Sequence, residues 1–255
     1  MIYLTGDTHG DWDRFLDERL ADRLGAGDIL IVCGDFGYIW ACEGHDDFAI
    51  RVEAKHLDDL AKLPYRILFV DGNHENFARL EAFPEVTLYG DKAHKIRENI
   101  YHLQRGGVYE IEGKRFFCFG GAASVDKWMR VPNRSWWARE LPDKADFARA
   151  EKSIARCGGS LDYILTHTAP VEIIQELGFQ AFGAEDVELT SYLSYVMHHC
   201  DFKKWFFGHF HVDRELRFVQ SNLFSRGEQE DVRTADSKAF RALYFDVVPL
   251  EEKAQ

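Results

Sequence analysis

Short apolar runs that end abruptly in polar residues recur along the chain. Each run is rich in β-branched or aromatic residues, and a Gly, Asp or His follows it directly. The runs are residues 2–5, 29–33, 67–70, 163–166 and 205–207. Because they lack the regular polar alternation of a half-exposed strand, they predict strands that are buried on both faces, in a sheet covered on each side.

Helical periodicity separates the first three of these runs. Apolar residues recur at helical spacing within residues 12–20 and again within residues 49–60. Strand and helix therefore alternate in this part of the chain, which is typical of βαβ units.

The second half has a different pattern. Residues 108–112 and 115–119, joined by Gly113-Lys114, predict a hairpin with a glycine turn. Residues 215–220 and 242–248 predict two further strands, and the polar, aperiodic residues 225–238 predict a surface loop. Together the two halves predict an α/β (α+β) fold in which mixed sheets are sandwiched by helices.

Length and composition favour a single domain over residues 1–255. A chain of 255 residues, 46% of them hydrophobic and 14% aromatic, is long and apolar enough for a full-sized core. Only 6 prolines are present, and no Pro, Ser or Gly tract offers a linker between two domains.

The net charge of the chain disfavours nucleic acid as a partner. The net charge is -12, from 43 acidic and 31 basic side chains. An acidic surface repels a phosphate backbone, which disfavours sequence-independent binding of nucleic acid. Bound divalent metals can nevertheless turn one acidic pocket into a site for an anion.

Nothing in the sequence predicts export or membrane insertion. A strand-like run follows Met1 where a signal peptide would place basic and then apolar residues. No apolar run approaches the roughly 18 residues of a membrane span, and the 5 cysteines are scattered without a Cys-x-x-Cys pair. We therefore expect a cytoplasmic protein without a membrane partner.

The candidate chemistry lies directly after the apolar runs, where functional residues of α/β sheets gather. The set combines carboxylate, amide and imidazole groups and contains no thiolate. Its members are Asp7, His9, Asp35, Asn73, His74, His167, His209 and His211. Such ligands suit Mn²⁺, Fe or Zn²⁺ better than a soft metal. A shared carboxylate can hold two ions about 3.5–4 Å apart, the separation used for in-line phosphoryl displacement.

In this order, the five motifs resemble the calcineurin-like metallophosphoesterase family. The motifs are Asp7-x-His9, Gly34-Asp35, Gly72-Asn73-His74-Glu75, His167 and Gly208-His209-x-His211. Each is weak alone, and the match rests on all five standing in order after predicted strands. The resemblance implies two packed mixed β-sheets with helices outside.

The resemblance also implies a role for each residue. One metal would be held by Asp7, His9 and His211, and the other by Asn73, His167 and His209. Asp35 would bridge both, and a hydroxide shared by the metals would be the nucleophile. His74 would donate a proton to the leaving oxygen as the general acid or steady the charge on the phosphate.

The second motif departs from part of that family. Many of its phosphoprotein phosphatases read Gly-Asp-x-Val-Asp-Arg-Gly there, and the second Asp pairs with the catalytic histidine. Here Tyr38 stands in place of that Asp and Ile39 in place of the Arg. The departure argues against a protein Ser/Thr phosphatase and leaves the partner of His74 open, with Tyr38 and Asp71 as hypotheses.

The stretch from Ser124 to Glu140 holds three of the 6 tryptophans together with several basic residues. Two interpretations stay open. The tryptophans can anchor a long connection onto the core. Alternatively, the stretch is a lid or rim that offers an aromatic face and the guanidinium groups of Arg130 and Arg134 to a phosphate.

The function predicted from these residues is hydrolysis of a small or nucleotide-like phosphoester, by a phosphatase or phosphodiesterase that uses two divalent ions. A nuclease of the same fold is a second hypothesis, but it needs a basic track that the net charge disfavours. A non-enzymatic binding module is a third. Relatives of that kind lose ligands or the catalytic histidine, and all eight positions are intact here.

Overall fold

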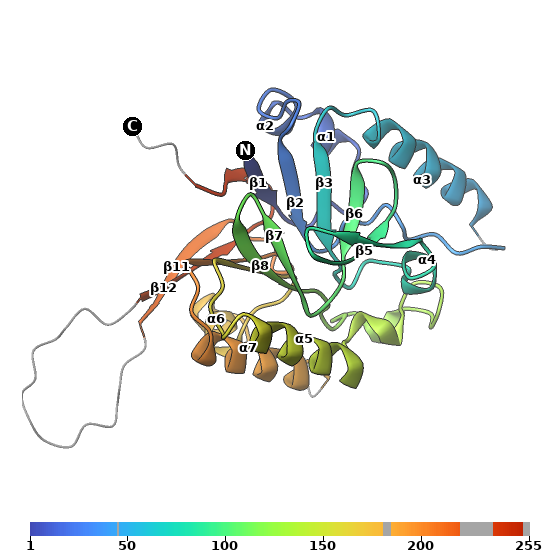
Figure 1. Cartoon of the computed structure of the whole chain (residues 1–255). Coiled ribbons are helices and arrows are strands. Elements are labelled where there is room, and N and C mark those ends of the chain that lie inside the picture. The colour runs from blue at the N-terminus through green and yellow to red at the C-terminus, as the bar shows by residue number, and fades with distance from the viewer. Residues whose placement is uncertain (45, 181–184, 220–236, 252–255) are drawn as a thin grey trace, which may run out of the picture.

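Two β-sheets pack face to face, and helices cover the outer face of each (Figure 1). The computed structural model describes residues 1–44, 46–180, 185–219 and 237–251. The arrangement confirms the predicted fold of two packed mixed sheets sandwiched by helices.

The first sheet has a parallel centre and antiparallel edges. Its parallel strands, in spatial order, are β1 (Ile2–Thr5), β2 (Ile29–Cys33), β3 (Arg66–Val70) and β6 (Ile100–Leu103). The antiparallel strands are β13 (Val248–Pro249) beside β1, then β5 (Asp91–Lys95) and β4 (Glu85–Leu88) beside β6. The parallel centre matches the βαβ pattern of the sequence.

The second sheet is built in the same way from the later part of the chain. Its parallel strands are β12 (Ser237–Ala242), β10 (Lys204–Phe207), β9 (Tyr163–Thr166) and β8 (Lys114–Phe119). The antiparallel edges are β11 (Arg214–Val219) and β7 (Gly107–Ile111). The β7–β8 pair is the predicted hairpin.

The central strands are buried on both faces because their residues alternate between two cores. In β2, Leu30 and Val32 enter the core under the outer helices, whereas Ile29 and Ile31 enter the core between the sheets. All five residues of β2 are buried. The prediction from the continuous apolar runs is confirmed.

The helices divide between the two outer faces. Against the first sheet pack α1 (Asp13–Leu16), α2 (Glu18–Ala21), α3 (Asp47–Leu60) and α4 (Phe77–Leu80). Against the second pack α5 (Lys144–Arg156), α6 (Val171–Glu176) and α7 (Val187–His199). Two short 3₁₀ helices, Lys127–Met129 and Ala138–Glu140, lie within the tryptophan-rich stretch. No helix among the described residues is long and apolar enough to cross a membrane.

Two boundaries predicted from periodicity were wrong. The helical pattern of residues 12–20 is divided because Asp17 is extended, and its carboxylate accepts from the N–H of Arg19. The strand predicted over residues 242–248 is interrupted because the carboxylate of Asp213 accepts the N–H groups of three consecutive residues, 244–246. Of the predicted loop, residues 225–236 lie outside the described residues, while residues 237–238 begin β12.

A buried ion pair fixes the end of β3. The Arg105 guanidinium donates to one carboxylate oxygen of Asp71 at 2.8 Å from Nε and 2.5 Å from Nη2. The ring of His102 lies 3.0 Å from the other oxygen. These side chains are buried, so removing one partner leaves a charge without compensation.

Arg105→Gln should therefore lower the free energy of unfolding by about 3–5 kcal/mol. Urea denaturation followed by circular dichroism measures the change. Arg97→Gln is the matched control, because the Arg97–Asp58 pair is partly exposed and such pairs contribute about 1 kcal/mol or less. Equal losses in the two variants would contradict a structural role for the buried pair.

Candidate metal centre

The eight predicted site residues gather where the carboxyl ends of strands from both sheets meet. Backbone hydrogen bonds join these strand ends. The N–H of Asp7 donates to the carbonyl of Gly34 at 3.2 Å, and that of His9 to the carbonyl of Asp35 at 2.8 Å. Within the second sheet, the N–H of Gly208 donates to the carbonyl of His167 at 3.0 Å. The loops that carry the site are thus fixed to one another by main-chain contacts.

The backbone at the site is unusual. Among the described residues, eight that are not glycine have a positive φ, and five of these are predicted ligands. Those five are Asp7, His9, Asp35, His209 and His211, with φ between 48° and 69°. Each residue in such a conformation lowers the stability of the fold by about 1–3 kcal/mol, and it persists only where the surrounding structure fixes it. The concentration of these residues at one place indicates a functional site.

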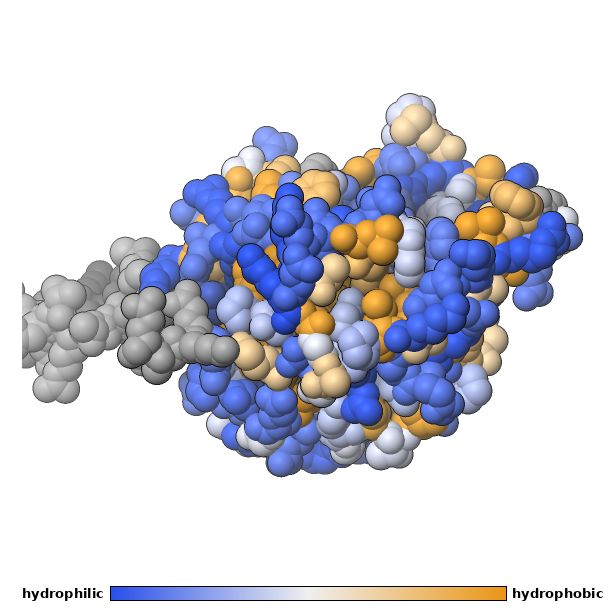
Figure 2. All heavy atoms as spheres, turned by 90° about the horizontal axis from the view of Figure 1, so that it is seen from above, coloured by the Kyte–Doolittle hydropathy of each residue, from blue (hydrophilic) through white to orange (hydrophobic). Residues whose placement is uncertain are grey.

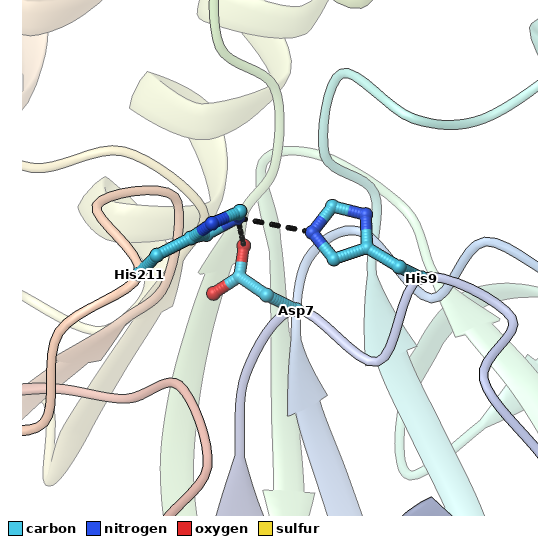
Figure 3. A group of neighbouring side chains, drawn as sticks. All are labelled: Asp7, His9 and His211. Carbon is cyan, nitrogen blue, oxygen red and sulfur yellow. Dashed lines mark hydrogen bonds and ion pairs between the residues drawn. The ribbon is translucent and has the colours of Figure 1, made fainter. Parts of the chain in front are cut away.

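The first group of converging donors is Asp7, His9 and His211 (Figure 3). His9 and His211 point toward one another from opposite sides, with their Nε2 atoms 3.0 Å apart. The carboxylate of Asp7 rises between them, 3.8 Å from His211 Nε2. Two imidazole nitrogens that face each other at this distance can share a proton, or both lone pairs can bind one cation.

Asp35 lies between this group and a second one. One of its oxygens is 3.7 Å from His9 Nε2, and the other is 3.3 Å from His167 Nε2. The latter oxygen also accepts the N–H groups of Asn73 at 2.9 Å and His74 at 2.8 Å. The carboxylate is therefore held by backbone donors while it faces histidines of both groups.

A second group lies around His167, which is within reach of one ion together with Asp7 and Asp35 and adjoins Asn73 and His209. His167 donates from Nδ1 to the carbonyl of Cys33 at 3.1 Å, which turns its Nε2 to within 3.1 Å of the amide oxygen of Asn73. The Asn73 amide nitrogen donates to Ser124 Oγ at 3.3 Å, so its oxygen faces the site. The ring of His209 lies edge-on to that of His167, with centroids 4.9 Å apart.

The charges of the site are balanced by protons when only protein groups are present. Burial raises the pKa of Asp7 to about 8 and lowers that of His209 to about 3, an effect that His167 strengthens. Burial alone would also lower the pKa of His167, but the carboxylates of Asp35 and Asp7 raise it to about 10. A buried pair of acids beside histidine nitrogens is a donor set that fits divalent cations, which would replace these protons.

The contacts of His74 differ from those of the predicted metal ligands. Its ring stacks on Trp40 at 5.2 Å between centroids and lies 4.8 Å from that of His9. The Arg130 guanidinium donates to His74 Nε2 at 3.1 Å, which occupies that nitrogen's lone pair. His74 also falls within reach of His9 and Asp35, but its Nε2 is engaged by Arg130.

The partner of His74 is thus Arg130, and neither hypothesis from the sequence finds support. Asp71 is bound to Arg105 and His102, and the buried ring of Tyr38 packs against Phe15, Phe36 and His56. Of the two predicted arginines, Arg130 reaches the site. The contact described for the side chain of Arg134 is an ion pair with Asp46 at 3.9 Å, away from these ligands.

Two buried acids support the site. For Glu75 the sequence left two hypotheses open, a group that orients ligands and a surface carboxylate, whereas Glu140 was not predicted. The Glu75 carboxylate accepts the N–H groups of Gly72 at 2.7 Å and Gly37 at 3.3 Å, which ties two site loops together. The Glu140 carboxylate accepts from Ser124 Oγ at 2.6 Å, and Ser124 in turn orients Asn73. The only signal for Glu75 was its place beside the Asn73 motif, and Glu140 had none.

A sequence profile of the calcineurin-like phosphoesterases matches residues 1–213. The chain belongs to this family. The membership makes it a metal-dependent phosphoester hydrolase and agrees with the converging donor groups.

Among individual proteins, the phosphoesterase is similar to the lariat debranching enzymes of Homo sapiens and Mus musculus. It is 29% identical to each over 136 residues, which are 49% of this chain and 23% of each relative. The match thus spans about a quarter of the length of the curated relatives. A solved structure described as a 5′-nucleotidase from Staphylococcus aureus aligns with a TM-score of 0.46 and 10% identity, over 96% of this chain and 48% of that one.

Gly34 allows the His167 ring to approach the end of β2, and Gly34→Ala should disrupt the metal centre. A Cβ at Gly34 would lie 2.0 Å from His167 Nδ1, at a φ of +85°. We expect a loss of bound metal, measured by elemental analysis, together with lower thermal stability.

Gly27→Ala is the matched control for backbone strain. Gly27 has nearly the same φ, +88°, but nothing lies within 4 Å of its Cβ position. Gly27→Ala should lower the free energy of unfolding by about 1–2 kcal/mol and leave the metal content unchanged. Normal metal binding by Gly34→Ala would show that the His167 ring does not need its present position.

Proposed function

We propose that this phosphoesterase hydrolyses a small or nucleotide-like phosphoester, as a phosphatase or phosphodiesterase, with two divalent ions. The observation that carries the proposal is that the donor atoms form overlapping groups on either side of Asp35. Mn²⁺, Fe and Zn²⁺ all suit the nitrogen and oxygen donors.

In this proposal Asp7, His9 and His211 would hold one ion, Asn73, His167 and His209 would hold the other, and Asp35 would serve both. When bound, the ions supply an activated water and neutralise charge on the phosphate. Hydrogen bonds from His167 to the Cys33 carbonyl and from Asn73 to Ser124 Oγ support the assignment, because they turn the Nε2 of His167 and the amide oxygen of Asn73 toward the centre.

His74 acts as the general acid, and Arg130 binds the phosphate. Stacking on Trp40 fixes the imidazole plane beside the predicted ligands. Once the Arg130 guanidinium turns from His74 Nε2 to a phosphate oxygen, that nitrogen is free to carry the proton that passes to the departing oxygen. The Arg130 guanidinium is held by Asp126 at 2.6 Å and touches His74, so it lies where a phosphate oxygen would arrive. Arg134 remains a weaker candidate for a contact with the substrate.

Three further parts of the proposal rest on separate observations. Residues 1–255 form one domain, since strands of both sheets share one core. The protein is cytoplasmic, because its cysteines are free and most are buried. A small substrate is favoured over a long nucleic acid by the net charge of -12.

Asp35→Ala should be the most damaging single loss of a ligand. Wild type should bind two ions per chain, lose activity on chelation and regain it with Mn²⁺. Asp35→Ala should weaken both sites, whereas Asn73→Ala and His167→Ala should chiefly weaken one. Elemental analysis and metal titration measure the stoichiometry. Two tightly bound ions in Asp35→Ala would overturn the bridge.

His74→Ala should keep both ions and the fold while kcat falls by about a hundred- to ten-thousand-fold on an alkyl ester, the usual contribution of general acid catalysis. The loss should be smaller for a nitrophenyl ester, because that leaving group departs without a proton. His198→Ala, on α7, is the histidine control and should change neither rate. A small, equal effect of His74→Ala on both esters would exclude His74 as the acid.

A further inference from the structure

A cavity of about 420 Å³ opens beside the metal centre. Its inner end is formed by His9 and His74, and it extends along α3 past Phe48, Val52 and His56, with Trp40 contributing to its wall. Sites for small molecules are typically about 300–1,000 Å³ and mostly apolar. The cavity is therefore large enough for a substrate group beyond the phosphate.

One face of α3 lines this cavity and takes no part in the core. Phe48, Val52 and His56 recur at intervals of four residues and line the cavity, whereas Leu57 and Leu60 from the end of the helix enter the core under the first sheet. Phe48 is 74% exposed. A ring this exposed contributes little to folding and is accessible to a ligand in the cavity that it lines.

The aromatic walls are held in place by other rings. Trp12 stacks on His56 with centroids 5.6 Å apart and an angle of 19°. Trp40 stacks on His74 and meets Trp137 edge-on at 5.1 Å. These contacts fix the ring planes of His56 and Trp40, which suits recognition of a flat ring.

Glu53 is the acidic residue in the lining, and both of its carboxylate oxygens already have partners in the protein. One oxygen of Glu53 accepts the N–H groups of Trp40 at 3.0 Å and Ala41 at 2.6 Å. The other pairs with Arg79 at 2.6 Å. Glu53 therefore anchors the loop that carries Trp40, and the lining favours an uncharged group.

We propose that this cavity binds a planar aromatic ring of nucleobase size, carried on the leaving alcohol of the ester. The inference rests on the proposed function, which places His74 next to the leaving oxygen. Because the cavity begins at His74, a group attached to that oxygen continues into it and lies against Phe48 and Val52. The ring subsite thus selects nucleoside esters over sugar phosphates that lack a base.

The first test uses a matched pair of substrates. Adenosine 5′-monophosphate and ribose 5-phosphate share the phosphate and the primary ester oxygen but differ in the base. With the Mn²⁺-loaded protein, kcat/KM should be at least about ten-fold higher for the nucleotide, since stacking of one base supports an effect of this size. The methyl diesters of both compounds, assayed for release of adenosine or ribose, extend the test to a diesterase.

Phe48→Ala should remove most of this preference by lowering kcat/KM for the nucleotide much more than for ribose 5-phosphate, and it should leave thermal stability unchanged because the ring is exposed. Tyr195→Ala is the matched control: Tyr195 is 53% exposed on α7 and does not line the cavity. Val52→Trp should also abolish the preference, because the larger side chain would fill the cavity and exclude the base.

Binding of adenosine, which carries no phosphate, is measured by titration calorimetry and separates this inference from the proposed function. If adenosine binds in a Phe48-dependent way while no ester is hydrolysed, the subsite stands and the proposed function fails. If hydrolysis occurs without a base preference, and Phe48→Ala leaves adenosine binding unchanged, the subsite is wrong. If the protein prefers hexyl phosphate over the nucleotide, and this preference depends on Phe48, the cavity binds an alkyl chain and the proposed ring subsite is wrong.

Discussion

A carboxylate can be buried only where other groups compensate its charge, and Asp35 is the buried carboxylate around which both sheets are joined. Its donors come from separate parts of the chain: the N–H groups of Asn73 and His74 follow β3, and His167 follows β9 of the other sheet. No single sheet supplies these partners. The position of one side chain therefore requires that the two sheets pack with their strand ends together.

The packing between the sheets makes such a site possible. Strands β1, β2 and β3 bury every second residue against β8, β9 and β10, so their carboxyl ends are rigid. Only a rigid frame can hold Asp7, His9 and His211 in left-handed backbone conformations at the same time. The glycines beside them have the complementary role, since a side chain at Gly208 would meet the carbonyl of Cys33 at 2.5 Å.

The sequence predicted the parts of this arrangement that depend on local pattern. Continuous apolar runs identified the buried strands, and their ends identified residues that gather at one place, because parallel strands bring their ends to one edge. It did not identify β4, whose residues alternate between exposed and half-buried positions, or α5, where Asp143 and Asp146 form a capping box in a largely polar segment. Nor did it identify Arg130 as the partner of His74. That contact joins residues 56 positions apart, and no local pattern encodes it.

The two interpretations of the tryptophan-rich stretch are compatible, because single residues in it belong to both the core and the site. Trp137 is buried in the core and also meets the Trp40 that lines the cavity. Ser124 and Glu140, at the two ends of the stretch, are hydrogen-bonded to each other and orient Asn73. Anchoring the stretch thus fixes Asn73, the Arg130 beside His74 and the cavity wall together. A substitution that loosens the tryptophan-rich stretch would displace all of these side chains. The selectivity of the cavity and the geometry of the metal centre therefore depend on the same segment of the chain.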